Sequence, residues 1–196
     1  MKNLASKILV VFGLMMSLSI SANDIEKTIK VKEENVTSMS FEKVEQGSTL
    51  QIKDQNGLVL YKEVIAQSGD YSKGFDLTAL PNGDYFFELN SESKIVVIPF
   101  NVNASTVLFD KDSKEFIYKP VVRTKDDMVY VSRTVLEHTP LSYKVYYSDN
   151  YDLVHTAKFN EMEEVKKAYD FSTAKKGNYV FVFESKGRKF SKKIKI

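Results

Sequence analysis

Residues 75–85 read FDLTALPNGDY, and residues 169–179 read YDFSTAKKGNY. The two stretches share an aromatic residue, an Asp, an apolar residue, a Gly and a Tyr in the same order, at an offset of 94 positions (169 minus 75). The same offset continues downstream from Phe87 to Phe181. An apolar pattern alone can recur by chance. The same Asp and Gly at one offset therefore indicate a duplicated unit.

Each copy reads as short strands separated by turns. In the first copy, apolar and polar residues alternate through 29–32 and 38–42, which is the period of a half-buried strand. Residues 50–52 continue the pattern. Aligning them with residues 145–147 of the second copy requires a shift of one residue from the common offset. About seven short strands per copy are typical of an antiparallel sandwich of the immunoglobulin-like class. The sequence therefore predicts an all-β protein with two tandem immunoglobulin-like β-sandwich domains.

Two turns of the first copy contain glycine. Asn56-Gly57 separates two apolar strands and predicts a type I′ hairpin turn, because both residues tolerate a positive φ. Pro81-Asn82-Gly83 predicts a chain reversal before a strand at 85–89. The second copy keeps the glycine alone, as Gly177, so we expect a positive φ at this position in both copies.

The other shared residues have expected structural roles. Asp76 and Asp170 precede the turn, where a carboxylate can accept backbone N–H groups. Tyr85 and Tyr179 begin the next strand, where a ring can pack inward while its hydroxyl bonds back to the loop, as in the tyrosine corner of sandwiches. Because they recur in both copies, we interpret six residues as structural: Asp76, Gly83, Tyr85, Asp170, Gly177 and Tyr179.

The N-terminus has the pattern of a secretory signal peptide. Lys2 and Lys7 form a positive region, residues 8–16 are apolar apart from one glycine, and small residues follow. We expect cleavage after Ser21, with cleavage after Ala22 and an uncleaved anchor as alternatives. The apolar stretch is shorter than the about 20 residues that span a bilayer. A cleaved signal predicts a secreted, periplasmic or outer-membrane-associated protein with no stable membrane span.

The predicted organisation has three parts: a signal peptide at 1–21, a first sandwich at 22–104 and a second sandwich at 105–196. The second sandwich includes an added hairpin at about 106–119, which has no counterpart in the first copy. Residues 161–169 depart from the strand scheme, since their apolar side chains share one helical face. They predict a helical turn before the next strand.

Composition excludes several classes of protein. The chain is 43% hydrophobic and 28% charged, as in ordinary globular proteins. It contains no Cys, which excludes disulfides, thiolate metal sites and a lipoprotein anchor. Removing Lys2 and Lys7 with the signal lowers Lys+Arg from 28 to 26, equal to the 26 Asp+Glu. A formally neutral chain gives no general reason to expect nucleic-acid binding.

Residues that could support catalysis are few. His138 is expected in a turn, and His155 falls at the strand position that Tyr61 occupies in the first copy. Without a second His at ligand spacing, these roles are favoured over a general base or a metal ligand. Acidic pairs such as Asp110 and Asp112 are interpreted as solvated turn residues, with a calcium site as the alternative. The sequence thus predicts no enzyme and no catalytic, cofactor-binding or metal-binding residues.

Tyrosines are concentrated around one predicted hairpin of the second copy. They are Tyr143, Tyr146, Tyr147 and Tyr151. Strand alternation sends Tyr143 and Tyr147 to one face and Tyr146 to the other. The cluster is a candidate platform for a sugar or a peptide, because Tyr offers an apolar face and a polar tip. The alternative is ordinary packing in the core.

Several stretches of the first copy resemble the C-terminal sorting domain of the type IX secretion system. They are LQI at 50–52, NG at 56–57, FDL at 75–77 and LPNGDYF at 80–86, and the basic end of the chain at 187–196 resembles the last strand of that family. The resemblance implies a small β-sandwich read by an outer-membrane secretion machine of Gram-negative bacteria. The chain departs from the family by lacking a Tyr-Pro-Asn-Pro-like opening and a cargo domain.

Together these observations predict a non-catalytic exported protein with a structural or interaction role in the cell envelope or outside the cell. Its expected partner is an envelope or secretion-machinery protein, or a glycan. A carbohydrate- or peptide-binding module is one alternative, and it predicts exposed tyrosines. A sorting-domain-like protein of the type IX system is another. An enzyme would instead require convergent carboxylates or a histidine in a concave pocket.

Overall fold

The computed structural model describes residues 29–31, 36–110 and 113–196, and the predicted signal peptide at 1–21 lies outside them. The described residues are all β: they contain no α-helix, and their strands pair antiparallel. The chain divides between Phe116 and Ile117 into two compact units.

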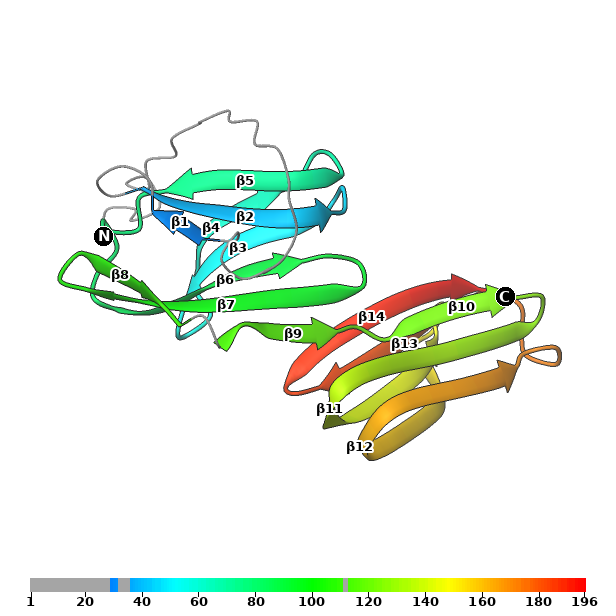
Figure 1. Cartoon of the computed structure of the whole chain (residues 1–196). Helices are drawn as coiled ribbons and strands as arrows, with labels where there is room; N and C mark the ends of the chain where they lie inside the picture. The colour runs from blue at the N-terminus through cyan, green and yellow to red at the C-terminus, as the bar shows by residue number, and fades with distance from the viewer. Residues whose placement is uncertain (1–28, 32–35, 111–112) are drawn as a thin grey trace. The chain divides into compact units, whose positions relative to one another are not determined.

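The first unit is a two-layer β-sandwich (Figure 1). One sheet has the order β1-β2-β5 and comprises Ile29–Val31, Thr37–Val44 and Gly69–Phe75. The other has the order β4-β3-β6-β7-β8 and comprises, in chain order, Thr49–Asp54, Val59–Val64, Gly83–Asn90, Lys94–Asn103 and Thr106–Phe109. Phe75 of the first sheet packs on Phe87 of the second, with ring centroids 5.3 Å apart. The core therefore lies between the two layers.

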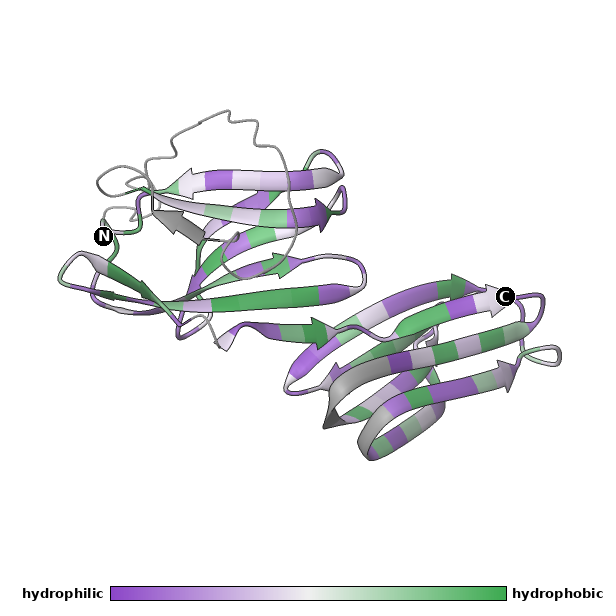
Figure 2. Ribbon diagram, viewed as in Figure 1, coloured by the Kyte–Doolittle hydropathy of each residue, from purple (hydrophilic) through white to green (hydrophobic). Residues whose placement is uncertain are grey.

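Strand alternation explains which side chains form this core. Leu50 and Ile52 of β3 are fully buried, whereas Gln51 between them is partly exposed. Figure 2 shows β7 as an almost continuously hydrophobic strand. Burial of such side chains is the main source of stability in a chain without disulfides.

The second unit comprises β10 (Val121–Lys125), β11 (Met128–Tyr147), β12 (Asp152–Asp170), β13 (Asn178–Ser185) and β14 (Arg188–Lys195). Its sheet order is β10-β11-β13-β14, with β12 paired to β11. The strands β11 and β12 are long and bent (Figure 1), and register shifts between Thr134 and Leu141 interrupt their pairing. The two halves of this hairpin face each other, since the hydroxyls of Tyr143 and Tyr169 lie 2.5 Å apart.

The two units have the same strand topology. The first part of β11 pairs with β10 and with the last part of β12, as β2 pairs with β1 and β5. The last part of β11 pairs with the first part of β12 and with β13, as β3 pairs with β4 and β6. Four strands of the first unit thus correspond to two continuous strands of the second. The predicted tandem β-sandwich architecture is confirmed.

The register corrects one detail of the repeat. Ile52 pairs with Phe87, and Val145 pairs with Phe181, so Ile52 corresponds to Val145. The predicted slip placed Ile52 on Tyr147 and was wrong in direction. Tyr147 corresponds to Asp54 instead, because these two residues pair with Tyr179 and Tyr85.

The predicted helical turn at 161–169 is also wrong, because this segment belongs to β12. Val165 pairs with Arg133, and Tyr169 pairs with Val129. Residues four apart share a face in a strand as well as in a helix, so Val165 and Tyr169 fit both patterns. The Lys166 Nζ lies 2.7 Å from Glu164 Oε1, an i,i+2 ion pair of the kind that one face of a strand allows.

The added segment at 106–119 does not form the predicted hairpin. Both β8 and β9 (Glu115–Tyr118) pair with β7, so β8 belongs to the first unit. The predicted boundary at 104/105 is therefore wrong, and the division lies at 116/117. A two-residue turn causes the difference: Ala104 (φ 47°) and Ser105 (φ 62°) form a type I′ turn that continues β7 into β8.

The turn at Asn56-Gly57 differs from the predicted type I′ turn. Gly57 has a positive φ of 82°, but Asn56 does not. Asp54 Oδ1 accepts the backbone N–H groups of Asn56 and Leu58, both at 2.9 Å. The carboxylate of Asp54 thus organises a longer turn, and a register shift follows between Ile52 and Lys53.

Candidate functional site

The shared Asp residues each organise a loop at the end of a strand. Asp76 Oδ1 accepts hydrogen bonds from the backbone N–H of Thr78 at 3.1 Å and from its hydroxyl at 2.6 Å. Asp170 Oδ1 accepts the backbone N–H of Ser172 at 2.8 Å. Hydrogen bonds from Ser172 lower the pKa of Asp170. Both loops therefore contain the Asp-to-backbone hydrogen bond that the sequence predicts.

The shared tyrosines close the same loops. Tyr85 Oη donates to the carbonyl of Pro81 at 2.8 Å, and Tyr179 Oη donates to the carbonyl of Lys175 at 2.7 Å. Both rings are buried, and this burial raises the pKa of each phenol. The identical geometry, with a carbonyl four residues back, indicates a structural role in each unit.

The shared glycines adopt backbone conformations that other residues rarely take. The φ angles are 158° at Gly83 and 147° at Gly177. At Gly177 a Cβ atom would also lie 2.6 Å from Tyr147 Oη, whereas at Gly83 its nearest contact would be 3.7 Å from the Tyr85 ring. Gly177 thus satisfies both a conformational and a packing requirement.

The tyrosines of the candidate platform follow the core-packing alternative instead. Tyr143 is 1% exposed and lies in the core with Tyr147, as strand alternation predicts. Tyr146 lies on the opposite face of β11, and Tyr151 is 73% exposed in the adjoining turn. The four rings therefore do not share one exposed surface, because alternation and the turn separate them. Among them, Tyr147 lines a pocket.

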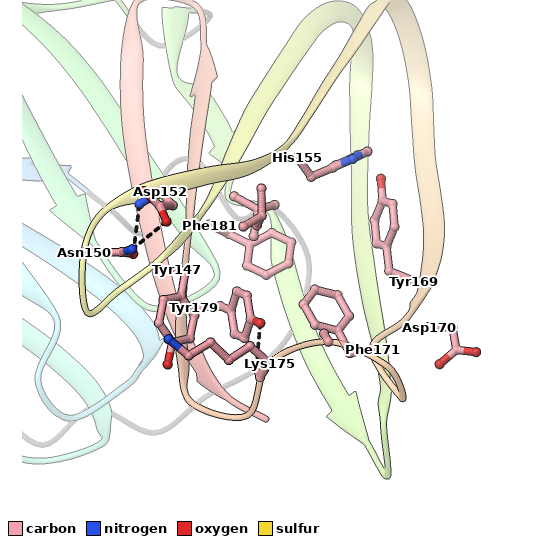
Figure 3. A pocket seen from close by; sticks show the side chains of 13 residues that line it. Tyr147, Asn150, Asp152, His155, Tyr169, Asp170, Phe171, Lys175, Tyr179 and Phe181 are labelled. Atoms are coloured by element: carbon pink, nitrogen blue, oxygen red, sulfur yellow. Dashed lines mark hydrogen bonds between the residues drawn. The ribbon is translucent and has the colours of Figure 1, made fainter.

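This pocket has a volume of about 430 Å³ and lies within the second unit (Figure 3). Its residues come from the end of β11, from the turn between β11 and β12, from both ends of β12, from the loop that follows β12, and from β13. The aromatic lining residues are Tyr147, Tyr169, Phe171, Tyr179 and Phe181. The polar lining residues are Asn150, Asp152, His155, Asp170 and Lys175. A concave site with an apolar interior and a few polar groups is typical of ligand pockets.

Comparison of the two repeats explains why the pocket exists. Leu80 of the first unit is 5% exposed and belongs to its core, and the equivalent residue of the second unit is Ala174. Leu60 packs against the first core, where the second unit has the smaller Val154. Loss of this side-chain volume leaves the space that the first unit fills. Aligning the two repeats residue by residue could have revealed this signal, which the single motif did not.

The hydroxyl groups of the lining tyrosines are occupied by the protein itself. Tyr147 Oη donates to Asp149 Oδ2 at 2.9 Å and contacts the carbonyl of Lys176 at 3.2 Å. Tyr179 Oη donates to the Lys175 carbonyl, and Tyr169 Oη is bonded to Tyr143 Oη. These tyrosines therefore offer ring surface to the pocket rather than free hydroxyls.

The carboxylates of the pocket do not converge. Asp152 Oδ2 accepts the side-chain amide of Asn150 at 2.5 Å, whereas Asp170 is bonded to Ser172. Figure 3 shows Asp152 and Asp170 at opposite sides of the pocket. The described residues contain no group of three or more His, Asp or Glu that could hold a metal ion.

Two polar lining residues make ring contacts. The Lys175 Nζ lies 4.4 Å from the centroid of the Tyr147 ring. The His155 ring lies 4.9 Å from the Tyr169 ring in an edge-to-face arrangement. The same arrangement joins Tyr61 and Phe75 in the first unit, at 5.2 Å, so His155 has the packing position expected from the repeat.

In the first unit, a polar cluster lies at the open edge between the two sheets, which corresponds to the edge of the second unit that contains the pocket. Glu63 Oε2 accepts hydrogen bonds from the hydroxyls of Tyr61 and Tyr71 and from the Lys73 ammonium. These residues come from β4 and β5, so the cluster joins the edges of the two sheets. Burial alone would raise the pKa of Glu63, but these hydrogen bonds outweigh it and lower the pKa. Sequence analysis missed the cluster because its members gather only when two strands of different sheets meet.

No protein-family model and no curated protein matches the chain. Among solved structures, a "Biofilm associated protein - BSP domain" aligns over 84% of this chain and 27% of its own, with 15% identity and a TM-score of 0.30. A "tetra-tandem repeat in extending region of large adhesion protein" aligns over 86% of this chain and 47% of its own, with 16% identity and a TM-score of 0.30. The chain thus spans less than half the length of either structure.

The fold assignment rests on the sheet topology described above, and the resemblance to type IX sorting domains stays a prediction. In the part of the chain that the structure describes, no helix is long and apolar enough to cross a membrane.

Proposed function

We propose that the protein is a non-catalytic binding protein of the cell envelope or the cell exterior, and that the pocket of the second unit is its ligand site. The observation that carries the proposal is the pocket at Ala174, at the position where the first unit buries Leu80. Export is supported by the signal-peptide pattern of the N-terminus.

The chemistry of the pocket supports binding rather than catalysis. General acid–base catalysis needs proton-transfer groups placed around one reacting position. Asp152 instead accepts a hydrogen bond from Asn150, and Asp170 accepts one from Ser172, at opposite sides of the pocket. His155 packs edge-to-face on the ring of Tyr169, as Tyr61 packs on Phe75 in the first unit.

In this proposal the first unit has a structural role. Its equivalent edge is filled by leucines and closed by the Glu63 cluster, so it supports the fold without an equivalent ligand site.

The test uses the full mature chain and the neutral fluorescent probe N-phenyl-1-naphthylamine, which brightens in apolar sites. We expect saturable binding by the wild-type protein and loss of binding by Ala174→Leu, which restores the side chain of the first unit. Thr173→Leu adds a leucine at the neighbouring exposed position and should keep binding. A folded Ala174→Leu variant that binds the probe as the wild type does would contradict the proposal.

A further inference from the structure

We propose further that the ligand is a small amphiphilic carboxylate, with an apolar body inside the pocket and its carboxylate held at Lys175. This inference rests on the proposed function of the pocket and concerns the chemical class of its ligand.

The interior of the pocket favours an apolar body. The hydroxyls of Tyr147, Tyr169 and Tyr179 are already hydrogen-bonded within the protein. The accessible apolar lining residues are Val154, Phe171 and Ala174, which offer carbon surface alone. A sugar placed there would bury hydroxyls without partners, which is unfavourable. An aromatic ring or a branched aliphatic group would instead replace the side-chain volume that the second unit lacks.

The rim of the pocket favours an anion at Lys175. In the described part of the chain, the Lys175 ammonium forms no ion pair, and its contact is the face of the Tyr147 ring. The next residue, Lys176, is paired with Asp127 at 2.6 Å. A ligand carboxylate can therefore bind Lys175 without breaking an existing ion pair.

Comparison of the two repeats shows that the residue that opens the pocket and the lysine at its rim are adjacent in the sequence. The first unit has Leu80 and Pro81 where the second has Ala174 and Lys175. Two adjacent positions thus differ together, one by opening a pocket and the other by adding a cation at its mouth. The Lys175 carbonyl accepts the Tyr179 hydroxyl, which fixes the backbone from which this side chain extends.

Acidic residues lie on more than one side of the pocket, since Asp149 accepts the hydroxyl of Tyr147 while Asp152 and Asp170 line the pocket. Among the described residues that line the pocket, Lys175 is the one cation. Asp152 and Asp170 repel a carboxylate, and Figure 3 shows the Asp170 carboxylate directed away from the pocket. The Lys175 side chain lies beside Tyr147, so the carboxylate of the ligand is placed at this side of the opening.

The test compares three probes with one naphthalene body: 2-naphthylacetate, 2-naphthaleneethanol and 2-naphthylethylamine. Each displaces N-phenyl-1-naphthylamine from the full mature chain, and the fall in fluorescence gives its affinity. We expect the carboxylate to bind about two to five times more tightly than the alcohol, as is usual for one exposed charge pair, and the amine to bind most weakly. The advantage of the carboxylate should shrink in 1 M salt, where the screening length is about 3 Å.

Variants assign the preference to one lysine. Lys175→Gln should lower the carboxylate-to-alcohol affinity ratio to about one, while the matched control Lys176→Gln should keep the wild-type ratio. Equal binding of the three probes by the wild type, or tightest binding of the amine, would overturn the carboxylate inference and leave the pocket as a ligand site. Probe binding that is unchanged in Ala174→Leu would contradict the proposal that this pocket is the ligand site.

Discussion

Tyr85 and Tyr179 each connect the start of a strand to the loop before it through a single hydroxyl. Of the Pro-Asn-Gly turn in the first unit, the second unit keeps the glycine alone, yet the hydroxyl reaches the same carbonyl position in both. The loop geometry is therefore maintained by Asp, Gly and Tyr, and the residues between them are free to differ. This freedom allows Lys175 to stand where the first unit has Pro81.

Replacing Tyr85 or Tyr179 with Phe should lower the free energy of unfolding by about 1 kcal/mol, the typical net contribution of one hydrogen bond. Urea unfolding followed by far-ultraviolet circular dichroism measures the effect. Tyr130→Phe is the control, because the Tyr130 side chain is half exposed and its hydroxyl forms no hydrogen bond with the described residues. Stability equal to that of the wild type in both variants would show that the hydroxyls contribute nothing.

Gly177→Ala should lower the free energy of unfolding by about 2–4 kcal/mol, because it combines an unfavourable φ with a Cβ placed against the Tyr147 hydroxyl. Gly187→Ala is the matched control, since its φ of 70° is also positive but a Cβ there meets nothing within 4 Å. We expect a loss of about 1 kcal/mol for Gly187→Ala in the same denaturant titration. Equal losses in both variants would exclude a contribution from the contact with Tyr147.

At the scale of elements, alternation and turn residues were enough to predict most strands of the first unit. They did not predict that the second unit joins pairs of strands into β11 and β12. Apolar and polar residues alternate in the same way whether two strands are separate or form one bent strand. The prediction of a helical turn at 161–169 fails for a related reason, since Val165 and Tyr169 share a face in either structure. The type I′ turn formed at Ala104-Ser105, where neither residue is typical of that turn.

The candidate site was less accessible to sequence analysis. The sequence leaves Tyr147 open between a platform and the core, and the register of β11 places it in the core beside the pocket. Ala174 carries no signal by itself, because it matters only as the counterpart of Leu80. A cavity is a property of facing side chains, and these come from segments that are distant in the sequence.

The Glu63 cluster makes the stability of the first unit sensitive to acid. Since the folded state lowers the pKa of Glu63, its contribution is present above the unfolded value of about 4.3 and is lost as pH falls through the folded value. Glu63→Gln should therefore lower the free energy of unfolding by about 1 kcal/mol at pH 7 and by less at pH 3.

Urea titrations of wild type and variant at the two pH values measure this difference. Glu45→Gln, at an exposed position, should change stability little at either pH. A loss that is the same at pH 7 and pH 3 would mean that the ionised form of Glu63 is not what the cluster stabilises.

At the scale of the whole molecule, one topology serves two purposes. The first unit fills and closes the edge between its sheets, whereas the second leaves a pocket at the equivalent place. A repeated unit allows this difference, because Ala174 and Lys175 occupy the positions that Leu80 and Pro81 hold in the other copy without disturbing its packing.

The mature protein should begin at Ala22, because cleavage after Ser21 places small residues at the two recognition positions. Intact-mass measurement of the protein expressed in a Gram-negative host and recovered outside the cytoplasm checks this. A mass that corresponds to the full chain, recovered with the inner membrane, would support an uncleaved anchor instead.

The continuous hairpin of β11 and β12 has a consequence for the order in which contacts form. Once the turn at Ser148–Tyr151 has closed, each further pair between the two strands adds only a short loop, so pairing can proceed like a zipper from Tyr147–Asp152 toward Met128–Asp170. In the first unit, by contrast, Thr37 and Phe75 must meet across separate strands and intervening loops. In the second unit, strand pairs that are distant in the sequence can thus form one after another, each next to a pair that has already formed.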